Sequence, residues 1–150
     1  MSSAHLEYVA AGGNRHPSAA DWDANTLAYG SGNNIAIWDP QSTQHRGVTS
    51  LLSGHTDAVN SVKLFKDPST SRSILISGSA DKSVRLWLGS VEKSGTYAEA
   101  KCLNDHTGSV NTIAVLPGSN IFITGAADAT VIVWRFCISH TAGVSSITAL

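Results

Sequence analysis

The sequence predicts an all-β protein built from repeated units of short strands. Residues 54–62 and 74–87 have a second copy in residues 105–113 and 121–134, with similar residue types in the same order. Each copy contains runs rich in β-branched residues that end on a tryptophan, and such runs are typical of strands. Self-similarity at a period of about 20 to 50 residues indicates one supersecondary unit stacked on copies of itself.

The strands of each unit can be placed in order along the chain. Apolar residues at spacings of two or three predict a first strand, and a continuous apolar run predicts a buried second strand. A β-branched run closed by tryptophan predicts a third strand, and an outer fourth strand precedes the next unit. The predicted strands are 59–64, 74–77, 84–87 and 97–103 in one unit, 110–115, 121–124 and 131–134 in the next, and 48–52 as the outer strand of the unit before.

The same polar and aromatic positions recur in both full units. They are His55, Ser77, Asp81 and Trp87 in one unit, and His106, Thr124, Asp128 and Trp134 in the other. In each unit the aspartate precedes the tryptophan by six residues, and the tryptophans at 38, 87 and 134 lie 49 and 47 residues apart. This pattern resembles the WD40 repeat family, whose period is about 40–45 residues and whose repeats form β-propeller blades.

The resemblance implies a role for each set of four residues. Asp81 would accept a hydrogen bond from His55, His55 would bond Ser77, and Ser77 would accept from the indole N–H of Trp87, with the second set arranged alike. A carboxylate, an imidazole, a hydroxyl and an indole are each costly to bury without a partner. Linked in a chain, they satisfy one another and join the strands. Both sets are therefore interpreted as structural tetrads.

A serine, a histidine and an aspartate in hydrogen-bond order also match a hydrolase triad. The set occurs twice and each copy ends on a tryptophan, so repetition favours architecture over catalysis. We expect no enzyme activity, no catalytic residue and no cofactor. A metal site is not expected either, because Cys102 and His106 are four residues apart with no second ligand pair, and the remaining histidines lack ligand spacing.

The whole chain, residues 1–150, is interpreted as one partial propeller. Its blade-like repeats are expected at about 14–52, 53–103 and 104–138, and residues 139–150 resemble the start of a fourth repeat. Propellers typically have about four to eight blades. The sequence therefore predicts an open arc of about three blades plus the first strand of a fourth, belonging to a larger propeller, and its uncovered edges favour association.

Composition narrows the class of partner. The formal net charge is −1 and only 14% of residues are charged, which argues against a strong phosphate-driven nucleic-acid binder. Cys102 and Cys137 lie beside apolar residues and are interpreted as buried reduced thiols, which suits a reducing compartment. With no apolar run of about 18 residues, we expect a cytoplasmic protein that can also be nuclear. Trp22 is interpreted as a core residue.

The N-terminal part resembles one subfamily more closely. Residues 7–15, 20–22, 27–31 and 34–40 are similar to the opening of the family of second subunits of the Elongator complex. That resemblance implies a non-catalytic scaffold that contacts other protein subunits and supports the complex that modifies the wobble uridine of tRNA. The alternative is a generic adaptor that binds peptides in signalling or ubiquitin-ligase complexes. No membrane or small-molecule substrate is expected, and direct contact with tRNA stays open.

Overall fold

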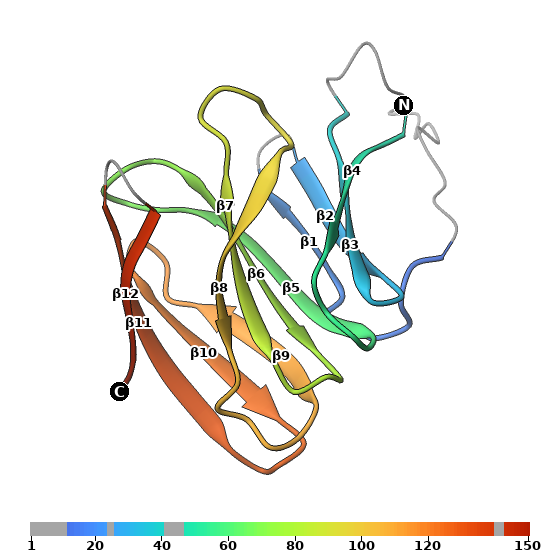
Figure 1. Ribbon diagram of the computed structural model, residues 1–150, viewed down its shortest axis with the longest axis vertical. Coiled ribbons are helices and arrows are strands. Elements are labelled where there is room, and N and C mark those ends of the chain that lie inside the picture. The colour runs from blue at the N-terminus through green and yellow to red at the C-terminus, as the bar shows by residue number, and fades with distance from the viewer. Residues whose placement is uncertain (1–11, 24–25, 41–46, 140–142) are drawn as a thin grey trace, which may run out of the picture.

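The structure, a computed structural model, describes residues 12–23, 26–40, 47–139 and 143–150. Within these residues the chain forms three four-stranded antiparallel sheets that follow one another in sequence order (Figure 1). No helix with the length and apolarity that a membrane crossing requires is found among the same residues. The predicted all-β class is confirmed.

Each sheet is a simple meander, in which strands that are neighbours along the chain pair with each other. The first sheet consists of β1 (Ala20–Asp23), β2 (Thr26–Ser31), β3 (Asn34–Trp38) and β4 (Val48–Ser53). The second consists of β5 (Val59–Lys66), β6 (Ser73–Ser79), β7 (Val84–Gly89) and β8 (Tyr97–Leu103). The third consists of β9 (Val110–Val115), β10 (Ile121–Ala126), β11 (Val131–Ser139) and β12 (Gly143–Ala149).

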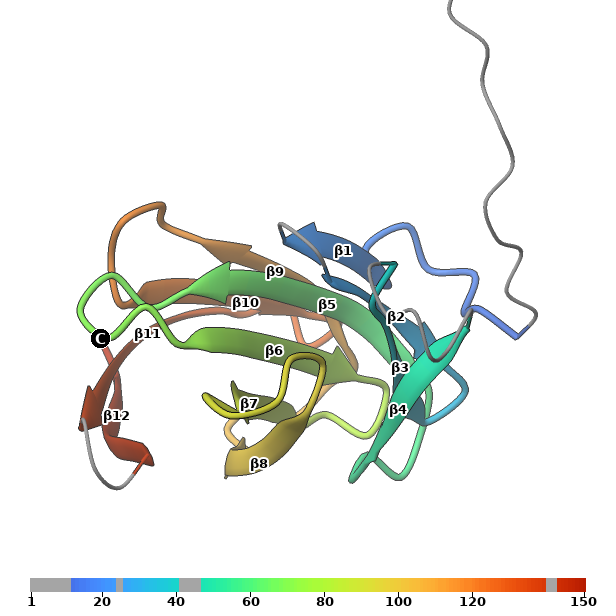
Figure 2. The same ribbon diagram turned by 90° about the horizontal axis from the view of Figure 1, so that it is seen from above.

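The sheets pack face against face, with the first strand of each sheet against the sheet before it. Strand β5 contacts β1 and β2, and β9 contacts β5 and β6. Seen from above, the three sheets fan out from this side of the molecule (Figure 2). This arrangement places the loops that enter β5 and β9, and the tight turns that join β6 to β7 and β10 to β11, at one end of the fan, the lower end in Figure 1.

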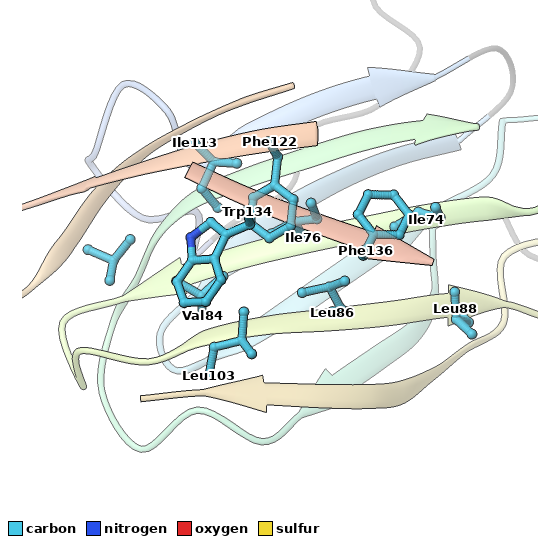
Figure 3. Close-up of a cluster of buried hydrophobic side chains, with 11 residues drawn as sticks. Ile74, Ile76, Val84, Leu86, Leu88, Leu103, Ile113, Phe122, Trp134 and Phe136 are labelled. Atoms are coloured by element: carbon cyan, nitrogen blue, oxygen red, sulfur yellow. The ribbon is translucent and has the colours of Figure 1, made fainter. Parts of the chain in front are cut away.

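Two apolar cores lie between the sheets, and they hold the fan together. The core between the second and third sheets is aromatic at its centre, where Phe122 stacks on Trp134 at a centroid distance of 6.0 Å (Figure 3). Phe65 meets Phe136 edge-on in the same core. Burying each large apolar side chain contributes roughly 1.5–3 kcal/mol. The core between the first and second sheets is formed by Ala28, Ile35, Ile37, Leu52, Val59, Val62, Leu64, Leu75 and Trp87.

The last strand differs from the prediction. Residues 139–150 are expected to start a fourth unit, but β12 pairs antiparallel with β11, with Phe136 opposite Ile147, and so completes the third sheet as its outer strand. The physical reason is that β11 otherwise presents an unpaired edge, and the closest strand along the chain satisfies its backbone groups. His140, which carries the resemblance to a repeat start, lies outside the described residues.

Two predictions of burial are also wrong. Trp22 is 49% exposed, packing edge-on against Trp38 at 6.1 Å. Cys137 is exposed and Cys102 half-buried, and both are free thiols. Strand alternation explains the cysteines, because each lies one residue away from positions that point into the core. Trp22 lies on the outer face of the first sheet, where no other sheet of this structure packs.

Candidate functional site

The first tetrad is assembled by three strands and the loop that enters the second sheet. Nδ1 of His55 donates to Asp81 at 2.9 Å, the Ser77 hydroxyl donates to Nε2 of His55 at 2.8 Å, and the indole of Trp87 donates to Ser77 at 2.9 Å. A fifth residue joins them, since Ser83 donates to Asp81 at 2.7 Å and lies 3.1 Å from Nδ1. The order of bonds is the one that the resemblance implies.

The second tetrad repeats this geometry in the third sheet. His106 bonds Asp128 through Nδ1 at 3.2 Å and Thr124 through Nε2 at 2.8 Å, and Trp134 donates to Thr124 at 2.9 Å. Thr130 occupies the position of Ser83, 3.1 Å from Nδ1 and 2.5 Å from Asp128. Two separate segments of the polypeptide therefore form the same series of hydrogen bonds.

The aspartates are held ionised by the donors around them. Burial acts to raise the pKa of Asp81, but hydrogen bonds from the Ser83 hydroxyl and from the N–H groups of Thr56 and Ser83 lower that pKa from 3.8 to about 2. The Thr130 hydroxyl and backbone donors likewise hold the pKa of Asp128 well below its ordinary value of 3.8. Each carboxylate thus ties an incoming loop to a turn.

Burial has the opposite consequence for His55. It lowers the pKa of the imidazole below 6.5, and this effect outweighs the neighbouring Asp81 carboxylate, which raises the pKa. At neutral pH the ring is therefore uncharged, with its Nδ1 proton toward Asp81 and its Nε2 accepting from Ser77. The tautomer follows because an ionised carboxylate can only accept.

The hydrogen bonds of this geometry match those of a hydrolase triad, but a substrate has no access to the serine hydroxyl. The Ser77 side chain has an exposed fraction of 0%, as has Thr124 in the other tetrad. The Ser77 oxygen also accepts from Trp87, so one of its lone pairs is already occupied. A nucleophile must reach a reacting carbon at about 3–3.5 Å, and the packing around Ser77 leaves no such approach in this conformation.

Ser83 and Thr130 are the tetrad neighbours that the sequence reasoning missed. Both follow the turn aspartate by two residues, and that shared spacing was the available signal. The residue between, Lys82 in one turn and Ala129 in the other, has a φ of 74° or 62°. A left-handed residue at this point folds the hydroxyl back onto the carboxylate, as in a tight turn closed by an Asp side chain.

Among its described residues, the first sheet shows no such tetrad. Tyr29 stands at the position of Ser77, next to Gly30, and the turn residue Asn33 uses its side-chain amide to donate to the carbonyl of His55 at 3.1 Å. Asn14 adds a second link, bonding the carbonyls of Gly32 and Val59 at 2.7 and 2.8 Å. These two side-chain amides join the first sheet to the second through backbone acceptors, and the Asp21 carboxylate adds a link by accepting from the N–H of Leu64 at 2.8 Å.

Exposed side chains gather where the loops and turns of the tetrads meet, and we call this surface the rim. It comprises residues 54–58, 80–83, 105–109 and 127–130. Asp57, Lys82 and Ala129 are exposed there, whereas Ser109 is half-buried and shares its hydroxyl with Asn60 and Asn111. The rim combines a fixed backbone with several exposed side chains, which is what a binding surface on a rigid scaffold requires.

A second candidate surface is a hollow of about 500 Å³ at the outer edge of the fan, where β12 approaches β8. Its walls combine apolar and charged groups, and burial raises the pKa of the Tyr97 hydroxyl within it. The lining includes Arg72, Leu88, Tyr97, Glu99, Gly143 and Val144. Among the described residues, no three His, Cys, Asp or Glu side chains gather closely enough to hold a metal ion.

Comparison with known proteins places these repeats in context. Residues 43–87 and 98–135 match the family model described as WD domain, G-beta repeat. Elongator complex protein 2 of Danio rerio is 31% identical over 142 residues, which cover 91% of this chain and 16% of that protein. Elongator complex protein 2 of Drosophila melanogaster is 35% identical over 128 residues, which cover 82% of this chain and 15% of that protein.

A solved structure has the same fold. The crystal structure of the WD40 beta propeller domain of Doa1 superposes with a TM-score of 0.55 at 20% identity, covering 85% of this chain and 38% of that one. This chain spans about one sixth of the length of the two curated relatives described above.

Proposed function

The chain belongs to the WD40 repeat family, and from that premise we propose that it is a non-catalytic scaffold whose rim holds other protein subunits. The observation that carries the proposal is the repeated tetrad, in which every reactive group is buried and bonded to a neighbour. Because the tetrad is repeated and buried, it supports a structural role for these groups. Because the side chains of the rim are exposed, they support a binding role for that surface. Rigid presentation lowers the cost of ordering a binding surface.

We further propose that the subunits belong to an Elongator complex, which by family resemblance modifies the wobble uridine of tRNA. Similarity to Elongator complex protein 2 over 82–91% of the chain supports this assignment, as do residues 7–40 in the sequence. The cytoplasm is the proposed location, with the nucleus as a second compartment. The free thiols of Cys102 and Cys137 suit such a reducing compartment.

Affinity purification tests the assignment and the rim together. The tagged chain is expressed in cells that contain an Elongator complex, beside a variant with Asp57→Lys and Lys82→Glu. We expect the wild type to recover Elongator subunits and the rim variant to lose most of them, because reversed charges oppose the partner surface. Lys93→Glu is the matched control, exposed in the connection between β7 and β8 at the end of the sheet away from the rim, and it keeps recovery.

Failure to recover Elongator subunits contradicts the assignment, and recovery unchanged in the rim variant contradicts the surface. Recovery of ubiquitin-ligase or signalling components alone favours the second candidate, a general peptide-binding adaptor. The hollow between β8 and β12 is the observation that favours that candidate, since its mixed lining suits a short peptide.

A separate experiment tests the absence of catalysis. A fluorophosphonate probe labels a serine that its histidine activates, and we expect no labelling of Ser77 in the folded chain because its hydroxyl is enclosed. Labelling at Ser77 in the native protein would show an accessible nucleophile and reverse the structural interpretation.

A further inference from the structure

The hollow between β8 and β12 has a counterpart between the first two sheets. The outer strands β4 and β8 each carry one extra residue, at the point where the pairing register shifts beside a tryptophan. The extra residue is Thr49 in β4 and Ala100 in β8. A bulge of this kind bends the strand and redirects a side chain. Thr49 and Ala100 are therefore equivalent positions, and Ala100 lines the hollow.

Between the first and second sheets, the chain itself covers this position. Residues 90–96 connect β7 to β8 and contact β4, where the Ser50 hydroxyl donates to the carbonyl of Gly95 at 2.9 Å. Gly95 is buried, and a Cβ added to it would lie 3.3 Å from Oγ1 of Thr49. The backbone of the segment therefore packs directly on the bulged residue. A short, irregular peptide segment is what this position accommodates.

Between the second and third sheets, the same position is the hollow of about 500 Å³. Strands β8 and β12 lie on either side of it, at the lower side of Figure 2. Its volume is within the range of about 300–1,000 Å³ that ligand sites have. Apolar contact is available from Leu88, Ala100 and Val144, which are buried or half-buried. The hollow therefore has the size and the apolar lining that a short peptide segment requires.

Arg72 is a charged residue of this lining, and most of its donors have no partner. A guanidinium has five N–H groups, yet among the described residues the Arg72 side chain donates only from Nη2, to the carbonyl of Gly89 at 3.2 Å. Its Nε is enclosed without a hydrogen-bond partner, and Arg72 is in no ion pair with another described residue. Buried donors are normally paired. A carboxylate in the hollow can accept from Nε and an Nη together.

Glu99, the other charged residue of the lining, already has a counter-charge. Its carboxylate accepts from Nη1 of Arg85 at 2.5 Å. The hollow therefore has one uncompensated positive charge, at Arg72, and it favours an anion. A carboxylate has a single charge and a planar pair of oxygens that match a guanidinium. A phosphate has nearly two charges, and the second charge would share the hollow with Glu99. The lining thus favours the side chain of a glutamate or an aspartate.

We propose that the hollow binds a short peptide segment of a protein partner, with an acidic side chain paired to Arg72 and apolar neighbours against Leu88 and Val144. The segment would lie beside Ala100 as residues 90–96 lie beside Thr49. This surface is separate from the rim, so it can hold a second partner while the rim holds the first. Its specificity comes from the carboxylate, because hydrogen bonds between two charged groups are the stronger ones.

Binding of defined peptide pools to the purified, immobilised chain tests the proposal. The two pools contain heptapeptides with glutamate or glutamine at the centre and Ala, Leu, Ser or Val elsewhere. We expect the wild type to retain the glutamate pool about tenfold better, and Arg72→Gln to retain both pools equally. Ala98→Trp, at an exposed position of the lining, fills the hollow and loses both pools. Arg135→Gln, exposed outside the lining, is the matched control and keeps the preference. The rim variant with Asp57→Lys and Lys82→Glu also keeps it, which separates this surface from the rim.

Four results overturn the proposal. Retention of neither pool by the wild type shows that the hollow does not bind such segments, and equal retention of both shows that Arg72 does not select a carboxylate. Full retention by Ala98→Trp places the binding site elsewhere, and loss of retention in the rim variant places it on the rim. Retention of a third pool, with phosphoserine at the centre, in preference to glutamate assigns the hollow to a phosphorylated segment. Circular dichroism confirms that each variant is folded, and Ala98→Trp alone decides the location if Arg72→Gln is not.

Discussion

The Ser77 hydroxyl shows how the tetrad works at the scale of one residue. It donates to Nε2 of His55 and accepts from the indole of Trp87, so one oxygen satisfies two groups from different strands and loops. Neither group has water available, because all three side chains are buried. A polar group left unpaired in such a place incurs its full desolvation penalty, and the chain of bonds therefore favours one arrangement of strands.

Replacing the first aspartate tests this reasoning. Asp81→Ala removes the acceptor of His55, Ser83 and the Thr56 N–H, and we expect it to lower the free energy of unfolding by about 1–3 kcal/mol. Asp57→Ala is the matched control, since Asp57 is exposed and accepts only from the adjacent Ala58 N–H among the bonds described. Urea unfolding of both variants measures the difference, and equal stabilities would contradict a structural role for Asp81.

The titration of His55 predicts how stability depends on pH. Its pKa is lower in the folded chain than the ordinary 6.5, so the unfolded chain binds more protons and stability falls as pH drops below about 6.5. Asp81 has a depressed pKa, and its contribution is present above 3.8 and lost as pH falls through about 2. Two separate windows of acid destabilisation are therefore expected.

Melting temperatures between pH 8 and pH 4 measure the first window. His55→Gln removes the titrating group, so we expect the slope between about pH 7 and pH 5 to flatten. His16→Gln, at a half-buried position outside the tetrads, is the control for the loss of an imidazole. A slope in His55→Gln that equals the wild-type slope would show that another group controls this window.

At the scale of elements, β12 is the strand that differs most from what the sequence predicts. Its pairing puts Cys137 directly opposite Ser146. Directly opposed residues have Cα atoms about 4.5–5.5 Å apart, which suits a disulfide. We expect Ser146→Cys to form a disulfide with Cys137 under mild oxidation, seen as a mass loss of two hydrogens.

Thr148→Cys is the control for this cross-link. Thr148 lies opposite Arg135, and diagonal neighbours are about 7–8 Å apart, beyond ordinary disulfide reach. Cross-linking of Cys137 with Thr148→Cys but not with Ser146→Cys would show another register. If neither variant cross-links to Cys137, the result would support the expectation from sequence that residues 139–150 start a further sheet.

The strands could be predicted because their signals are local. Runs such as 74–77 and 131–134 combine β-branched residues with flanking turns. The first run lies within β6 and the second within β11. The tetrads could be proposed because the same spacing recurs twice. The pairing of β12 with β11 could not be predicted, because the sequence of a strand does not specify which free sheet edge it pairs with. The exposure of Trp22 could not be predicted either, because it depends on whether another sheet covers its face.

At the scale of the whole molecule, close packing between sheets depends on glycines, because they have no Cβ at the points where the sheets approach. A Cβ at Gly78 would press on Val110, whereas a Cβ at Gly13 would meet only Tyr29 at 4.0 Å. We therefore expect Gly78→Ala to lower the free energy of unfolding by about 1–3 kcal/mol through overpacking. Gly13→Ala should leave it nearly unchanged. Urea midpoints compare the two, and similar values would show that the sheets can separate at little cost.

A double-mutant cycle between Ser77→Ala and Trp87→Phe tests the tetrad brace most directly. The two residues share a hydrogen bond of 2.9 Å inside the core. If the tetrad acts as one linked brace, urea unfolding of the two single variants and the double variant gives a coupling free energy of about 0.5–3 kcal/mol. Effects that add to within about 0.3 kcal/mol would contradict it, because independent groups behave in that way.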